Sequence, residues 1–130
     1  MSGSFWNIVI ALILIIHGIG HGLGILAVAN IKLSKTHSAH SWLLGKFLGD
    51  TGTRVVGFII WLLAFIGFVG TGLGMLGWLV PQDMWPSLAI GASLISLLGL
   101  FLFWDAFPFM FPNKIGVIVV DVAVLVWLLF

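Results

Sequence analysis

The position of the charged residues constrains the fold of this chain most. All five Lys and Arg residues fall in two stretches, residues 31–54 and 105–114, and long apolar runs make up most of the remainder. Of the 130 residues, 62% are hydrophobic and only 7% are charged, too few charges for the polar shell of a soluble domain. Lipid is therefore expected to cover much of the surface, and the pattern predicts a polytopic membrane protein.

A helix needs about 20 residues to cross a bilayer, and four apolar segments of the chain have lengths close to this. The first has no Lys or Arg before it and is too long for the core of a signal peptide, so we expect a retained helix. The predicted fold class is all-α, a transmembrane four-helix bundle in a single integral membrane domain. The predicted spans are residues 5–29, 55–80, 88–104 and 115–130.

The charges also predict the orientation of this bundle. With four spans, residues 31–54 and 105–114 lie on one face with all five positive residues, and the connection on the other face carries only Asp83. The positive-inside rule then places both basic connections in the cytoplasm and both termini outside. Between the first two spans, Trp42–Leu48 is either an amphipathic segment on the inner leaflet or part of an irregular loop.

Small residues recur at helical spacing inside the spans. Such stripes favour close helix packing, because small side chains let backbones approach where no hydrophobic effect drives association. The same stripes are also compatible with a flat cofactor lying against the backbone. The predicted packing positions are Gly18, Gly20, Gly22, Gly24, Gly67, Gly70, Gly74, Ser93 and Ser96.

Two histidines and one acid form the main polar constellation. His17 and His21 lie one turn apart on one face of the first span. Ionisable groups inside a membrane usually face the bundle interior and have a partner. Asp121 is the only acid inside a predicted span, and a rise of about 1.5 Å per residue puts it near the depth of His21. We therefore expect a His21–Asp121 contact, and a second polar pair between Arg54 and Asp105 at the inner face.

Several chemistries fit this constellation. The simplest is structural, with polar pairs fixing the packing of the bundle. Two histidines and a carboxylate are also a metal-ligand set, and one histidine is enough for a five-coordinate haem or a chlorophyll. A histidine–carboxylate chain is equally the kind of relay that conducts protons or ions. His37 and His40, in the long connection, are expected to be solvated.

Other classes are excluded. The chain has no cysteine, so disulfides, thiolate metal sites and cysteine nucleophiles are ruled out. A net charge of +1 without a basic stripe gives no basis for binding nucleic acid. There is no nucleophile elbow and no phosphate-binding loop, so no catalytic residues are predicted.

The chain resembles the small four-helix DoxX-like membrane proteins of bacteria and archaea. The residues that carry the resemblance are His17-Gly18 late in the first span, the small-residue faces of the next two, and the opening Lys114-Ile-Gly-Val of the last. The resemblance implies a protein of the prokaryotic cytoplasmic membrane. Some members are similar to small subunits of quinone-linked oxidoreductases.

The function expected from these observations is that of a non-catalytic accessory subunit in a larger membrane complex, such as a respiratory or other energy-conserving one. Its partners would be the lipid bilayer and other membrane subunits or a second copy. The alternative is a small redox or cofactor-binding protein that holds haem, chlorophyll, a quinone or a metal through His17, His21 and Asp121. A small proton or ion transporter is a further alternative.

Overall fold

The computed structural model describes residues 2–130, with side chains from residue 4 onward. Within this part the chain is helical and contains no strand, so the all-α prediction is confirmed. Short helical turns lie in the connections: η1 (Gln82–Met84), η2 (Trp104–Ala106) and η3 (Met110–Lys114). The main helices are α1 (Ser2–Gly20), α2 (Gly22–Val28), α3 (Gly45–Met75), α4 (Trp85–Leu102) and α5 (Ile115–Leu129).

Four helical segments are long and apolar enough to cross a membrane, which makes this a multi-pass membrane protein by length and composition. The first of them joins α1 and α2, and the third and fourth begin in the short turns before α4 and α5. Their bounds are Ser4–Val28, Gly45–Met75, Gln82–Leu102 and Met110–Leu129.

The predicted limits of the second span are wrong at both ends. Its helix begins at Gly45 rather than residue 55, and it carries a non-helical residue at Gly49, whose φ of 70° favours glycine. Its first turns therefore include polar residues that the apolar pattern had left in a loop. The helix ends at Met75 rather than residue 80, because positive φ angles at Gly77 and Leu79 turn the chain there.

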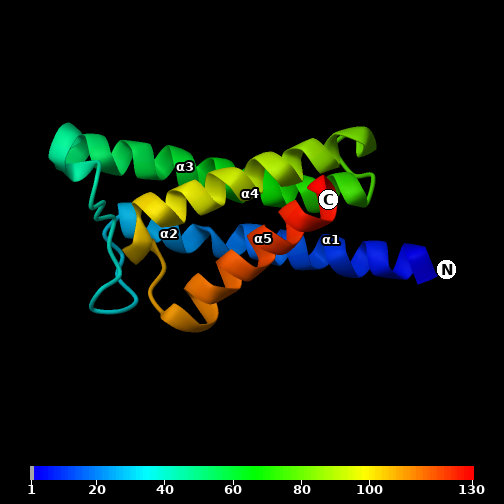
Figure 1. Cartoon of the computed structure of the whole chain (residues 1–130), viewed down its shortest axis with the longest axis horizontal. Helices are drawn as coiled ribbons and strands as arrows, with labels where there is room; N and C mark the ends of the chain where they lie inside the picture. Colours follow the sequence, from blue (N-terminus) through cyan, green and yellow to red (C-terminus); the bar gives the residue numbers. More distant parts are fainter. Residues whose placement is uncertain (1) are drawn as a thin grey trace.

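The bundle places both basic connections at the same end. The helix α3 packs along α1 and α2 and along α4, while α5 packs on α4. Figure 1 shows both termini and the α3–α4 turn at one end, and the other two connections at the opposite end. There the Ser38 N–H donates to the Asp105 carbonyl (2.9 Å) and the Ser34 hydroxyl donates to that of Pro108 (3.0 Å). All five Lys and Arg residues therefore belong to one end of the bundle.

Two apolar clusters fill the interior. One contains Trp61, Phe103 and Phe107, and the other contains Phe68 and Met75. The side chains of all five are at most 2% exposed. Rings of both clusters contact the histidines of the first span: Phe68 lies against His17 and His21, and Trp61 and Phe107 lie against His21.

Glycine makes the closest helix contacts. A Cβ atom on Gly24 would lie 2.5 Å from the buried Trp61 ring, and one on Gly18 would lie 2.9 Å from the backbone nitrogen of Val69. On α3, a Cβ on Gly67 would lie 2.8 Å from the Ala92 side chain of α4. These distances are shorter than real Cβ contacts, so the helices meet this closely only because no side chain is present.

Not every predicted packing glycine is used in this way. Gly74 is also tight, since its Cβ would lie 3.0 Å from the Cβ of Trp85. Gly22 and Gly70 have only ordinary contacts, at 3.8 Å and 3.5 Å, and a Cβ on Gly20 would meet nothing within 4 Å. For Gly20 the packing prediction is wrong, because this residue faces a cavity between α1 and α5.

The segment Trp42–Leu48 contains a turn followed by the start of α3. Trp42, Phe47 and Leu48 are exposed, and the Trp42 indole N–H donates to the carbonyl of Phe101 at the end of α4 (2.8 Å). The helical part, residues 45–48, is a short helix of its own, because the non-helical backbone angles of Gly49 separate it from the rest of α3. Whether this segment lies on the inner leaflet stays a prediction.

Candidate functional site

The polar residues of three helices meet between the two apolar clusters. His17 of α1 and Asp121 of α5 form one pair, with His17 Nε2 at 2.8 Å from Asp121 Oδ1. The predicted contact of Asp121 with His21 is wrong. Asp121 meets His17 instead, one helical turn earlier in α1. The prediction assumed that the first and last spans begin at the same depth, whereas the contact with His17 places Asp121 one turn farther from the basic end.

His21 bonds instead to the backbone of α1 and to α4. The helix is interrupted at this residue, because its backbone N–H donates to the carbonyl of Gly18 (3.0 Å) and leaves that of His17 free. The ring of His21 takes this place, with Nδ1 at 2.8 Å from the His17 carbonyl oxygen. A carbonyl only accepts, so Nδ1 carries the proton and Nε2, at 2.7 Å from the Ser96 hydroxyl, is the acceptor of the neutral ring.

Ser96 therefore takes part in the site as a hydrogen-bond partner, whereas the sequence suggested only a small packing residue. A serine facing two histidines in an otherwise apolar span is the signal that would have found it. His21, Ser96 and Asp121 are each 0% exposed. The His21 ring also stacks on Phe68 at a centroid distance of 5.3 Å and meets Phe107 edge-on at 5.7 Å.

The Oδ2 atom of Asp121 has no hydrogen-bond partner, although the residue is 0% exposed. A buried polar atom without a partner is costly, since it gives up its interaction with water and gains nothing in return. Asp121 thus has unused acceptor capacity.

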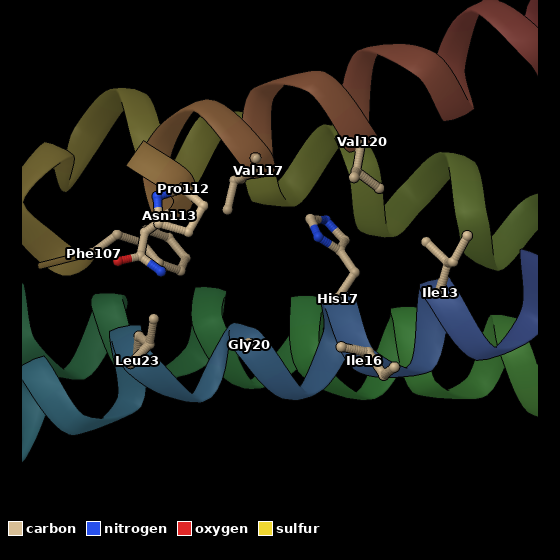
Figure 2. A pocket seen from close by; sticks show the side chains of 11 residues that line it. Ile13, Ile16, His17, Gly20, Leu23, Phe107, Pro112, Asn113, Val117 and Val120 are labelled. Atoms are coloured by element: carbon tan, nitrogen blue, oxygen red, sulfur yellow. The ribbon is translucent and has the colours of Figure 1, made fainter. Parts of the chain in front are cut away.

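An apolar cavity of about 280 Å³ lies next to His17, between α1 and α5. In Figure 2 the His17 ring projects from α1 toward α5, between Val117 and Val120, with Phe107, Pro112 and Asn113 at one end of the cavity. A second hollow of about 290 Å³ shares Ile13 and Val120 with it. We call the combined depression the α1–α5 groove.

The predicted Arg54–Asp105 pair is wrong. The Arg54 guanidinium donates to the carbonyl of Val28, one of the last carbonyls of α2, where a cation is favoured by the helix dipole. Asp105 instead lies 3.8 Å from Lys114 Nζ, which also sits 5.0 Å from the centre of the Trp104 ring. Arg54 thus stabilises the end of the first span. Lys114 makes its contacts within the α4–α5 connection, with Asp105 and Trp104.

His37 is buried, contrary to the expectation that it is solvated. It is 0% exposed, and its Nδ1 accepts from the Leu33 N–H (3.0 Å). Its Nε2–H is 2.9 Å from the carbonyls of both Leu23 and Ala106. The ring thereby ties the first connection to α2 and η2. His40 is exposed as expected, and nothing in the local sequence distinguishes the two histidines.

The two histidine rings leave no flat slot for a tetrapyrrole between them, because they lie edge to face with their centroids 4.8 Å apart.

Comparisons with known proteins give no match for this chain among protein-family models, curated proteins or solved structures. The chemistry of the site must therefore be argued from its own geometry.

Proposed function

We propose that this protein is an accessory subunit of a larger integral membrane complex, and that the α1–α5 groove is its contact with that complex. The observation that carries the proposal is the pair of polar residues at the bottom of the groove. The His17 side chain is 9% exposed there, and it holds the fully buried Asp121. Ionisable groups at membrane depth usually face protein or water rather than lipid tails, so a neighbouring protein covering the groove is favoured.

The apolar rim of the groove suits such a contact. Ile16, on the rim, is 69% exposed, and Ile13 beside it is 50% exposed. The DoxX-like resemblance supports the same proposal, since some members resemble small oxidoreductase subunits.

We also propose that the basic end of the bundle faces the cytoplasm, with both termini outside, in a prokaryotic cytoplasmic membrane. The support is the gathering of all five Lys and Arg residues at one end. Within this orientation, the exposed aromatic and leucine side chains of Trp42–Leu48 would lie at the inner leaflet.

Cross-linking from single cysteines tests the accessory role, because the natural chain has none. Ile16→Cys lies on the groove rim, and Ile66→Cys, 57% exposed on α3, is the matched control away from the groove. In native membranes we expect a short bifunctional thiol reagent to join Ile16→Cys to one other membrane protein, identified by mass spectrometry, and Ile66→Cys to give little adduct. A homodimer adduct or no adduct from Ile16→Cys would contradict an accessory subunit docked at this groove.

A second candidate function is that of a small cofactor-binding membrane protein. It is favoured by one observation, that ligand atoms of His17, His21 and Asp121 lie within 4.8 Å of one another and that one oxygen of Asp121 is unpaired. The two candidates separate in detergent-purified protein. A purely accessory subunit gives no visible absorption and no bound metal, whereas a cofactor protein gives one or both.

A further inference from the structure

We propose that His17, His21 and Asp121 form a binding site for one divalent transition-metal ion inside the bundle. Each residue offers one ligand atom, and the three atoms all lie within 4.8 Å of one another. They come from α1, from the break between α1 and α2, and from α5, so the ion would join the first and last spans. This inference rests on the second candidate function, the cofactor-binding protein, and names its ligand; it does not depend on the accessory role.

The spacing of the ligand atoms suits an ion after small side-chain rotations. Bonds of about 2.0–2.2 Å to nitrogen and oxygen set tetrahedral ligand atoms about 3.3–3.6 Å apart. His17 Nε2 and Asp121 Oδ1 are slightly closer than this, at 2.8 Å, and the widest separation in the set is below 4.8 Å. Binding of a metal ion would move His17 Nε2 and Asp121 Oδ1 slightly apart and bring the ligand atom of His21 closer to them.

The ring of His21 is already oriented for coordination. Its Nδ1–H donates to the His17 carbonyl, which leaves the lone pair on Nε2. Histidines that bind metals characteristically donate their other ring N–H to a backbone carbonyl or a carboxylate in this way. The hydroxyl of Ser96 now occupies the lone pair at 2.7 Å and is a weak competitor that a metal ion would displace.

The unpaired oxygen of Asp121 is the second, independent observation. Asp121 is 0% exposed, yet its Oδ2 has no hydrogen-bond partner. The His17 contact satisfies only Oδ1. A cation beside the carboxylate would supply the missing partner and offset the cost of holding this group within the membrane.

The donor set indicates the class of metal. Two imidazoles and one carboxylate suit Zn²⁺, Fe²⁺, Co²⁺ or Mn²⁺, whereas Ca²⁺ and Mg²⁺ prefer all-oxygen sets. Three protein ligands leave at least one coordination position free, as in catalytic zinc sites. His17 lines the apolar cavity of about 280 Å³, so a water molecule or a small exogenous ligand could reach that position from the α1–α5 groove.

Titration with Co²⁺ tests the proposal, because this ion fills zinc-type sites and absorbs visibly at low coordination number. The full chain, carrying a tag without histidine, is stripped with a chelator in detergent and titrated, and bound cobalt is counted by elemental analysis. We expect about one Co²⁺ per chain. Asp121→Asn keeps the size of the side chain, and we expect it to weaken binding beyond the about 10- to 100-fold caused by changes around a ligand.

Two further variants separate a site from non-specific binding. His21→Gln should weaken Co²⁺ binding as Asp121→Asn does, while His40→Ala, which removes an exposed loop histidine, should leave it unchanged. Circular dichroism and elution volume establish that each variant is folded. Failure of the folded natural chain to bind Co²⁺ would overturn the proposal, and so would equal affinity in folded Asp121→Asn and His40→Ala.

Discussion

Replacing His17 by alanine is expected to lower the free energy of unfolding by about 3–5 kcal/mol, because it leaves a buried acid without a partner. In the natural chain Asp121 Oδ1 has His17 at 2.8 Å, and Oδ2 has no partner at all. Removing the imidazole therefore removes the 2.8 Å hydrogen bond of Oδ1. The measurement is reversible unfolding in mixed detergent micelles, followed by circular dichroism.

The double variant His17→Leu/Asp121→Leu identifies the cause of this loss. Replacing both members of a buried pair with apolar residues is often neutral or stabilising. We expect it to recover most of the stability that His17→Ala loses, whereas His40→Ala changes little. If the single losses at positions 17 and 121 simply added in the double variant, the two residues would not interact, and the site geometry described above would be contradicted.

Gly72→Ala is expected to destabilise the bundle by at least about 1–3 kcal/mol, the usual effect of overpacking. A Cβ on Gly72 would lie 2.6 Å from the backbone oxygen of Ala11 and would also collide with the Ile15 side chain. Backbone cannot rotate away, so α1 and α3 must separate. The same unfolding assay measures the effect.

Gly20→Ala is the matched control. A Cβ on Gly20 meets nothing within 4 Å, and alanine is a better helix former than glycine by about 1 kcal/mol. This variant should be neutral or slightly stabilising. Equal destabilisation by Gly20→Ala and Gly72→Ala would show that these glycines affect stability through helix flexibility and not through the close helix contacts.

The spans and the gathering of charge follow from the sequence because both depend on composition alone. Apolar runs of this length have little alternative to membrane helices, and Lys or Arg cannot easily be placed within them. The ends of the second span were less predictable. The kink at Gly49 and the turn after Met75 depend on single backbone angles at Gly49 and Gly77, to which hydropathy is insensitive.

The members of the site were predictable, and their pairing was not. His17, His21 and Asp121 stood out because polar residues are rare in these spans. Which histidine meets Asp121 depends on the depth at which the last span begins, where one helical turn, about 5.4 Å, changes the partner. The break at His21 adds a second local effect, since it turns that ring toward the backbone and Ser96.

Charged residues near the membrane surface were the least predictable. Arg54 has a long side chain that reaches the end of α2, so the choice between that carbonyl and Asp105 depends on how far α3 extends toward the basic end. Likewise, the burial of His37 depends on the folding back of the first connection over η2, which no periodic pattern encodes.

Thiol labelling tests the central claim, a four-span bundle with both basic connections on one side, most directly. Three single-cysteine variants are made at exposed positions of a chain otherwise free of cysteine. Lys35→Cys and Met110→Cys lie in the two basic connections, and Gln82→Cys lies in the α3–α4 turn. In intact cells a membrane-impermeant maleimide should label Gln82→Cys alone, and permeabilisation should expose the other two together. Labelling of Lys35→Cys and Met110→Cys from opposite sides of the membrane would contradict the bundle, and with it the meeting of His17 and Asp121.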